Sequence, residues 1–295
     1  MASQNRTQGF QDEGDALPTR ISAVDGYSLA ASYFPGGSRG VVIGGAMAVA
    51  HNFYTPLARY LQGQGYSVLT FDYRGIGGSF PPDGTLRGFS ASVSDWAHND
   101  LQAALAWLEQ QPEIASVSLV GHSLGGQIVG MTESAPRLKS MVTLSSQSGY
   151  WKLQGGREPL KVLFHMYLTF PLLSRLVGYM PWSRFAKAKD VPKGAALQWA
   201  SWCRHPDYLF GDTSLPLHRY ANVIAPILAI SIADDDWGSA RSVDAMMLRY
   251  PNTTRRHLTP EEFGLRSIGH FGFFRAGNEA LWSLIPSWLE GPEEA

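Results

Sequence analysis

A serine between two glycines is the residue of this chain best suited to covalent chemistry. The segment Gly121-His122-Ser123-Leu124-Gly125 fits the G-x-S-x-G pattern, a strand-to-helix turn so tight that its central residue takes strained backbone angles. A short β-branched run, 117–120, precedes it, and helical spacing resumes over 126–131. This context separates the serine from an ordinary turn serine. We therefore predict that Ser123 is a nucleophile.

A serine hydroxyl attacks slowly near neutral pH unless a histidine takes its proton, and that histidine needs a carboxylate to fix its tautomer. Among eight histidines, His270 is favoured because glycines bracket it in a loop that opens the last helix. His122 adjoins the nucleophile, but its side chain is expected to point away. Three carboxylates after an apolar run are candidates for the acid, namely Asp234, Asp235 and Asp236. The order serine, aspartate, histidine along the chain belongs to one fold.

The elements that must position these residues alternate between strand and helix. Apolar runs predict strands, and helical spacing predicts helices between them. The expected strands are 40–46, 66–71, 117–120, 141–144, 226–232 and 255–259, and the expected helices are 54–61, 92–109, 126–131, 242–250 and 281–289. Such alternation predicts a parallel sheet with helices on both faces and with ligands beyond the carboxyl ends of its strands. Ser123 lies at such an end.

The start of the chain does not follow this alternation of strands and helices. Residues 1–17 are polar and suggest a loose leader. Two β-type runs follow, 19–24 and 27–34, and Asp25-Gly26 joins them. This dipeptide predicts a hairpin with a type I′ turn, because both central residues of that turn take positive φ.

The alternation also stops between residues 147 and 221, which predicts a helical insertion. Its aromatic density exceeds the 12% of the whole chain, and prolines are expected to divide it into short helices. Either its aromatic side chains form the core of a subdomain, or they line a substrate pocket in a lid over Ser123. No membrane span is expected over 160–180, since charged residues and a proline interrupt that stretch. These residues are Lys161, His165, Pro171 and Arg175.

Composition limits the class of partner. Lys and Arg number 24 and Asp and Glu 25, with no long basic block, so neither nucleic acid nor an anionic membrane is predicted as a partner. A small, largely uncharged molecule is expected instead. The single cysteine, Cys203, excludes an internal disulfide framework and is expected to be a small helix residue. Together with a polar start that lacks the layout of a secretory signal, this favours a cytoplasmic location. The sequence does not predict the oligomeric state.

Together, these segments resemble the α/β-hydrolase-fold serine hydrolases, in particular bacterial esterases and monoacylglycerol-lipase-like or serine-aminopeptidase-like members. The resemblance covers 19–146 and 222–290 and implies an α/β-hydrolase core there. This core is a mostly parallel central sheet with helices on both faces, and 147–221 is its inserted helical lid. The motifs that carry it are Gly121-His-Ser-Leu-Gly-Gly126, Phe71-Asp-Tyr-Arg-Gly-Ile-Gly-Gly-Ser79, Ala233-Asp-Asp-Asp236 and Gly269-His-Phe-Gly-Phe-Phe-Arg275.

The resemblance also assigns roles within these motifs. The family position of the acid falls on Asp235, which leaves its two neighbours as loop carboxylates or helix caps. The transition state of acyl transfer develops an oxyanion that two backbone N–H groups must bind. One donor is expected from Leu124, the first residue of the helix after the nucleophile. The other is expected from Ala46, with Met47 as the alternative, in a loop where the family often has His-Gly and this chain has Gly44-Gly45.

The predicted function is hydrolysis of carboxylic esters through an acyl-enzyme, with small to medium, largely uncharged, apolar substrates. An acyltransferase, a thioesterase or an amidase would use the same triad. A non-catalytic ligand-binding protein on this fold is the alternative from another class. A lipase whose lid opens on lipid is a third possibility, although stable membrane insertion is not expected. No cofactor is predicted, and no metal, because the three aspartates lack nearby His or Cys ligands.

Overall fold

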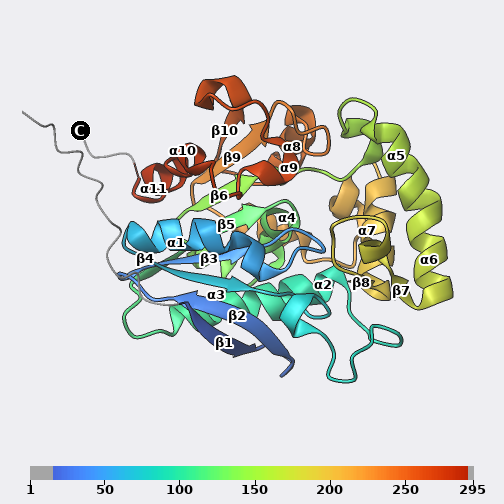
Figure 1. The fold of residues 1–295 in the computed structure, drawn as a ribbon, viewed down its shortest axis with the longest axis horizontal. Coiled ribbons are helices and arrows are strands. Elements are labelled where there is room, and N and C mark those ends of the chain that lie inside the picture. Colours follow the sequence, from blue (N-terminus) through green and yellow to red (C-terminus); the bar gives the residue numbers. More distant parts are fainter. Residues whose placement is uncertain (1–15, 292–295) are drawn as a thin grey trace, which may run out of the picture.

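An eight-stranded sheet forms the centre of the protein (Figure 1). The computed structural model describes residues 16–291, and in them the strands lie in the order β1-β2-β4-β3-β5-β6-β9-β10. Strand β2 pairs antiparallel with both of its neighbours, whereas the strands from β4 to β10 in that order pair parallel. The bounds are β1 (Leu17–Ser22), β2 (Ser28–Phe34), β3 (Arg39–Gly44), β4 (Tyr66–Phe71), β5 (Ser116–His122), β6 (Met141–Leu144), β9 (Ile227–Ile232) and β10 (Thr253–Leu258). The predicted mostly parallel sheet is confirmed.

Helices cover both faces of this sheet, because successive side chains of each strand point to opposite sides. Val41 packs with α1 (Thr55–Gly63), α10 (Glu279–Trp282) and α11 (Leu284–Leu289). Val42, the next residue, belongs to the core on the other face. That core includes α3 (Gln102–Glu109), α4 (Leu124–Ile128) and α8 (Ala240–Met247). Helix α3 continues α2 (Val93–Asp95) through a π-helical turn, Trp96–Leu101, so the helix predicted over 92–109 is one continuous element.

The first hairpin forms, but its turn differs from the prediction. Gly26 takes a positive φ of 87° and Asp25 does not, so the turn is not type I′. Instead, Gly26 N donates to Ala23 O, and Ala23 N donates to Tyr27 O, which closes a longer loop with a single left-handed glycine. Strand β1 starts at Leu17, inside the predicted leader. The rest of that leader, residues 1–15, lies outside the described residues.

The insertion folds into a helical cap at one end of the sheet (Figure 1). Its outermost element is a 20-residue helix, Glu158–Val177, composed of α5 (Glu158–Phe164), a π-helical turn (His165–Thr169) and α6 (Phe170–Val177). Helix α7 (Lys193–Arg204) lies between it and the sheet, and β7 (Tyr179–Met180) pairs with β8 (Val191–Pro192) beside it. Pro171 does not divide the helix as predicted, because it falls in the first turn of α6, where the π-helical turn has already changed the hydrogen-bond register.

The charged residues expected to interrupt this apolar stretch do not shorten the helix either. Among residues 16–291, Glu158–Val177 is the helix that is long and apolar enough to cross a membrane by length and composition. One such helix is weak evidence for a membrane span, since core helices of soluble proteins pass the same test. Only 22% of its apolar window is buried in the protein.

Candidate active site

Ser123 occupies the turn between β5 and α4 with a backbone conformation that few side chains tolerate. Its φ is 49° and its ψ −113°, and the side chain is 7% exposed. The turn is closed by glycines at which a methyl group would overlap backbone. A Cβ on Gly121 would lie 2.5 Å from Gly126 Cα, and a Cβ on Gly125 would lie 2.1 Å from Gly44 O. The predicted strand, tight turn and helix are therefore present around Ser123.

His270 and Asp235 form a close pair beside this turn. His270 Nδ1 lies 2.8 Å from Asp235 Oδ2. The other carboxylate oxygen accepts hydrogen bonds from Trp237 N and Gly238 N, at 3.0 and 2.8 Å. Burial alone would raise the pKa of Asp235, but the charge of His270 and these hydrogen bonds outweigh it and hold that pKa below its usual value. An ionised Asp235 accepts a hydrogen bond from His270 Nδ1–H, which favours the tautomer whose Nε2 carries no proton.

The structure distinguishes the three successive aspartates. Asp235 is 3% exposed and contacts His270, whereas both neighbours are exposed. Asp234 accepts hydrogen bonds from the backbone of Ile268 and Gly269, both at 2.9 Å, and so holds the loop that carries the histidine. Asp236 makes no contact with His270. The geometry of an acid partner is therefore found at Asp235, the residue that the family resemblance favoured.

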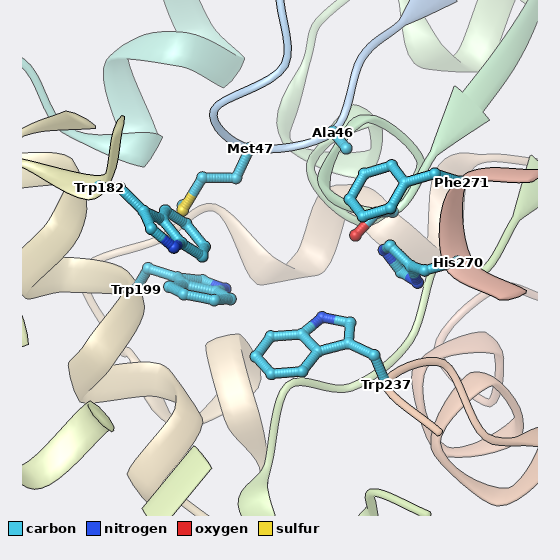
Figure 2. A pocket seen from close by; sticks show the side chains of 8 residues that line it. Ala46, Met47, Trp182, Trp199, Trp237, His270 and Phe271 are labelled. Atoms are coloured by element: carbon cyan, nitrogen blue, oxygen red, sulfur yellow. The ribbon is translucent and has the colours of Figure 1, made fainter. Parts of the chain in front are cut away.

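Ser123 and His270 line the same cavity, of about 250 Å³ (Figure 2). The rest of its wall is almost entirely apolar. It consists of Ala46, Met47, Trp182, Trp199, Trp237 and Phe271. In Figure 2, Trp182 and Trp199 lie across the cavity from His270. Both come from the cap, whereas Trp202, Tyr208 and Tyr220 are buried in the core that the cap shares with one face of the sheet. Some cap aromatics thus line the cavity and others pack in the core.

The structure contradicts the assignment of Ala46 as an oxyanion donor. Its N–H donates to Tyr54 Oη at 2.8 Å and is therefore directed away from the cavity. Met47, the alternative, lines the cavity beside Ser123, and no residue in 16–291 accepts a hydrogen bond from its N–H. Leu124 N stands at the start of α4, where backbone N–H groups have no acceptor within the helix.

Tyr54 belongs to a buried chain of hydrogen bonds that the sequence did not reveal. Tyr54 Oη lies 2.9 Å from His122 Nδ1, and His122 Nε2 lies 2.9 Å from His270 O. Because Tyr54 Oη accepts a hydrogen bond from Ala46 N–H, its own O–H donates to His122 Nδ1, and His122 Nε2–H donates to His270 O. Burial, and then the charge of His270, hold the pKa of His122 well below its usual value, so this imidazole is neutral.

A second serine also lies beside a histidine and an aspartate. Ser32 Oγ is 3.1 Å from His51 Nε2, and His51 Nδ1 is 2.9 Å from Asp72 Oδ2. Ser32, however, lies inside β2, whose backbone pairs with strands on both sides, so no free N–H groups surround it to bind an oxyanion. Asp72 also accepts a hydrogen bond from Gly78 N. Asp72 therefore holds the backbone of the loop that follows β4.

The described residues provide no other reactive centre of the kinds considered above. Residues 16–291 contain no group of three or more His, Cys, Asp or Glu side chains that could hold a metal ion. Cys203 is fully buried in α7, and burial raises the pKa of its thiol well above the usual value, which disfavours the thiolate.

Comparisons with known proteins agree with this architecture. An uncharacterized protein of Mycobacterium tuberculosis is 34% identical over 123 residues, which are 39% of this chain and 41% of that relative, so the match spans about two fifths of its length. Among solved structures, DcsB in complex with its substrate analogue superimposes with a TM-score of 0.65 at 15% identity, over 94% of this chain and 99% of the other. A thermophilic esterase from Thermogutta terrifontis superimposes with a TM-score of 0.60 at 15% identity, over 93% of this chain and 98% of the other.

Such low identities establish the fold alone, but the family evidence extends further. The model of the alpha/beta hydrolase family matches residues 36–279, which include the turn at Ser123, the aspartate at 235 and the histidine at 270. The chain belongs to the alpha/beta hydrolase family.

Proposed function

We propose that the protein hydrolyses carboxylic esters through an acyl-enzyme on Ser123. The observation that carries this proposal is the strained Ser123 in one apolar cavity with His270, whose Nδ1 is held by the buried Asp235. A backbone this strained persists only where the surrounding structure determines it, and such strain gathers at functional sites.

In this mechanism, His270 Nε2 takes the proton of Ser123 Oγ as that oxygen bonds to the ester carbonyl carbon. The negative charge on the former carbonyl oxygen is bound by Leu124 N–H and Met47 N–H. When the carbon–alkoxide bond breaks, His270 returns its proton to the leaving alcohol. Water then attacks the acyl-enzyme, with its proton passing to His270, and the acid leaves as Ser123 recovers its proton.

The wall of the cavity supports an uncharged, apolar substrate. Three tryptophans, Met47 and Phe271 supply hydrocarbon surface, and no Asp, Glu, Lys or Arg of residues 16–291 lines the cavity. A volume of about 250 Å³ suits an acyl or alcohol group of small to medium size. An esterase among the structures of similar fold is consistent with this reaction class. Thioester or amide cleavage would use the same residues and is tested with the same protein.

The test is labelling with a fluorophosphonate, followed by peptide mapping and by assays with p-nitrophenyl esters of graded length. We expect an adduct on Ser123, and we expect Ser123→Ala to lower ester turnover by about three orders of magnitude or more. The matched control is Ser32→Ala, which also removes a hydroxyl beside a histidine and an aspartate, and we expect it to keep activity. Folded protein without an adduct would favour a ligand-binding role.

A further inference from the structure

The outermost helix of the cap is apolar on two opposite faces. Its inner face carries Val162, Met166, Phe170 and Ser174, all buried. Residues two positions away lie about 200° around a helix and therefore on the opposite side. These outer residues form one line, in which exposures range from 49% to 72%: Leu160, Phe164, Leu168, Leu172 and Leu176. We call this line the outer ridge.

The outer ridge is unusual for a protein surface. An ordinary surface helix is apolar toward the core and polar toward solvent, whereas here leucines occupy the solvent side. Phe185, after the helix, is 66% exposed and adds to the same cap. Figure 1 shows α5 and α6 on the outside of the molecule, with nothing beyond them. A contiguous exposed apolar surface of this kind marks an interaction site.

Basic residues flank the outer ridge. Residues 150–193 contain eight Lys or Arg and two Asp or Glu. The rest of the chain contains sixteen Lys or Arg and twenty-three Asp or Glu. Of the two acidic residues, Glu158 pairs with Lys161. All eight basic residues of this segment are exposed: Lys152, Arg157, Lys161, Arg175, Arg184, Lys187, Lys189 and Lys193. The formal net charge of −1 therefore conceals a basic segment within the cap.

A second cavity, a groove of about 430 Å³, shares Trp182 and Trp237 with the cavity of Ser123. Its wall also includes the exposed Phe164 and Phe185 and the buried Met166 and Phe170, with Glu158, Lys161 and His165 among its polar members. A hydrocarbon chain that enters beside the outer ridge would thus meet the walls of the active site.

We propose that the outer ridge docks on the surface of an anionic lipid bilayer. Leucines and phenylalanines would enter the boundary between headgroups and acyl chains while the flanking lysines and arginines contact acidic headgroups. The inner face remains packed on the cap, so the helix lies on the membrane and does not cross it. A second copy of this chain fits the ridge less well, because two basic caps would then face each other.

The docking also deepens the proposed function, and in this respect it rests on that function. If Ser123 hydrolyses esters, its substrates include esters with a hydrocarbon chain that are held in the bilayer and reach it through the groove. The absence of a basic block in the sequence suggested no affinity for anionic membranes. In the structure, however, eight basic residues are exposed on the segment that carries the outer ridge.

The experiment is flotation of the full-length Ser123→Ala protein with vesicles, so that turnover plays no part in binding. We expect binding to vesicles that contain phosphatidylglycerol, and far weaker binding to pure phosphatidylcholine or at high salt. Each basic residue at the surface contributes about five-fold to such binding. The variant Leu160→Ser/Leu176→Ser should lower the partition coefficient at least about ten-fold, because both leucines lose their place in the apolar layer.

A matched control removes equally exposed apolar side chains elsewhere. Ile224 and Leu248 are 70% and 71% exposed, against 72% and 70% for Leu160 and Leu176. Ile224→Ser/Leu248→Ser should bind vesicles as the parent does. Circular dichroism checks that both variants are folded.

Three results would overturn the docking proposal. These are no flotation with anionic vesicles, equal loss in both double variants, and a lipid-free dimer that the ridge variant abolishes. The outcomes also separate the two proposals. Wild-type protein that hydrolyses a water-soluble ester but does not float leaves only the proposed function standing, and protein that floats without any hydrolysis leaves only the docking.

Discussion

At the scale of single residues, Tyr54 connects the two sides of the active site. It receives a hydrogen bond from Ala46, in the loop beside Ser123, and gives one to His122, which in turn holds the backbone of His270. The donor and acceptor of each of these three hydrogen bonds are fixed, because the amide of Ala46 can only donate and the carbonyl of His270 can only accept. We therefore expect Tyr54 and His122 to position both the loop of Ala46 and the His270 that the proposed mechanism uses.

Replacing Tyr54 by Phe tests this role. The change leaves Ala46 N–H and His122 Nδ1 buried without partners, which should lower the free energy of unfolding by about 1–3 kcal/mol. We expect kcat to fall more than KM changes, since the loop and His270 lose their alignment for the transition state. Urea unfolding and ester kinetics measure both effects.

Tyr60→Phe is the control, because it removes a hydroxyl from α1, the helix that begins directly after Tyr54, and this hydroxyl is bonded to neither Ala46 nor His122. A Tyr54→Phe protein with the kcat of the wild type would show that the chain of hydrogen bonds is structural only.

The three aspartates give a second prediction at this scale. Asp235→Asn would hold His270 in the wrong tautomer, and kcat should drop by about 10⁴-fold. Asp236→Asn, one residue away and exposed, should leave kcat near that of the wild type. Asp234→Asn weakens a contact to the loop of His270 and should have an intermediate effect. Equal losses in Asp235→Asn and Asp236→Asn would contradict the assignment.

The site was predictable from the sequence where local patterns determine the geometry. The glycines at the turn restrict Ser123, and a glycine-bracketed loop separates His270 from the other histidines. The oxyanion loop was not predictable, because the N–H of Ala46 is taken by a tyrosine eight residues later whose own partner, His122, lies 68 residues further along the chain. No sequence pattern predicts such a contact.

At the scale of elements, the carboxyl end of β3 touches the first turn of α4. A Cβ on Gly125 would lie 2.1 Å from Gly44 O, so the two backbones meet without any side chain between them. This close approach brings the loop after β3 beside the nucleophile. The positions of both oxyanion donors in the proposed mechanism depend on it.

Gly125→Ala should therefore be strongly destabilising, by about 3 kcal/mol or more, because the added methyl group displaces backbone in a packed core. A drop in thermal midpoint together with lost activity is expected. Gly272→Ala is the control, since a Cβ there meets its nearest atom at 3.5 Å, an ordinary contact, and should change stability little. Comparable midpoints for the two variants would show that the contact between β3 and α4 adapts.

Elements were predictable to the extent that periodicity specifies them. The strands of the parallel core and the helices between them appear near their expected bounds, because burial on both faces and amphipathic spacing leave clear patterns. The turn at Asp25-Gly26 and the helix through Pro171 were predicted wrongly. In both cases a single residue was read by its usual preference, whereas hydrogen bonds formed with neighbouring turns decided the local geometry.

At the scale of the whole molecule, His122 should make unfolding sensitive to acid. The unfolded chain binds a proton on this histidine below pH 6.5, whereas the folded protein does not, because its pKa is depressed by burial. The unfolded state then holds more protons, so stability falls as pH decreases below 6.5, by about 1.4 kcal/mol per pH unit for this group. Above pH 6.5 this histidine no longer makes the free energy of unfolding depend on pH.

Denaturant unfolding of the wild type and of His122→Asn across pH 4.5 to 7.5 measures this contribution. We expect the variant to be less stable throughout but less sensitive to acid by about 1.4 kcal/mol per pH unit. His257→Gln, at an exposed position of β10, is the control. Parallel pH curves for wild type and His122→Asn would mean that the buried imidazole becomes protonated without unfolding.

The burial of Cys203 has a practical consequence for spectroscopy. The chain has one cysteine, and its thiol lies inside α7 with a raised pKa, so maleimide and methanethiosulfonate reagents will react with it slowly. Site-directed labelling with thiol reagents therefore does not require the removal of Cys203. A cysteine introduced on the exposed surface would carry the sole fluorophore or spin label of the folded protein, without prior mutation of any native residue.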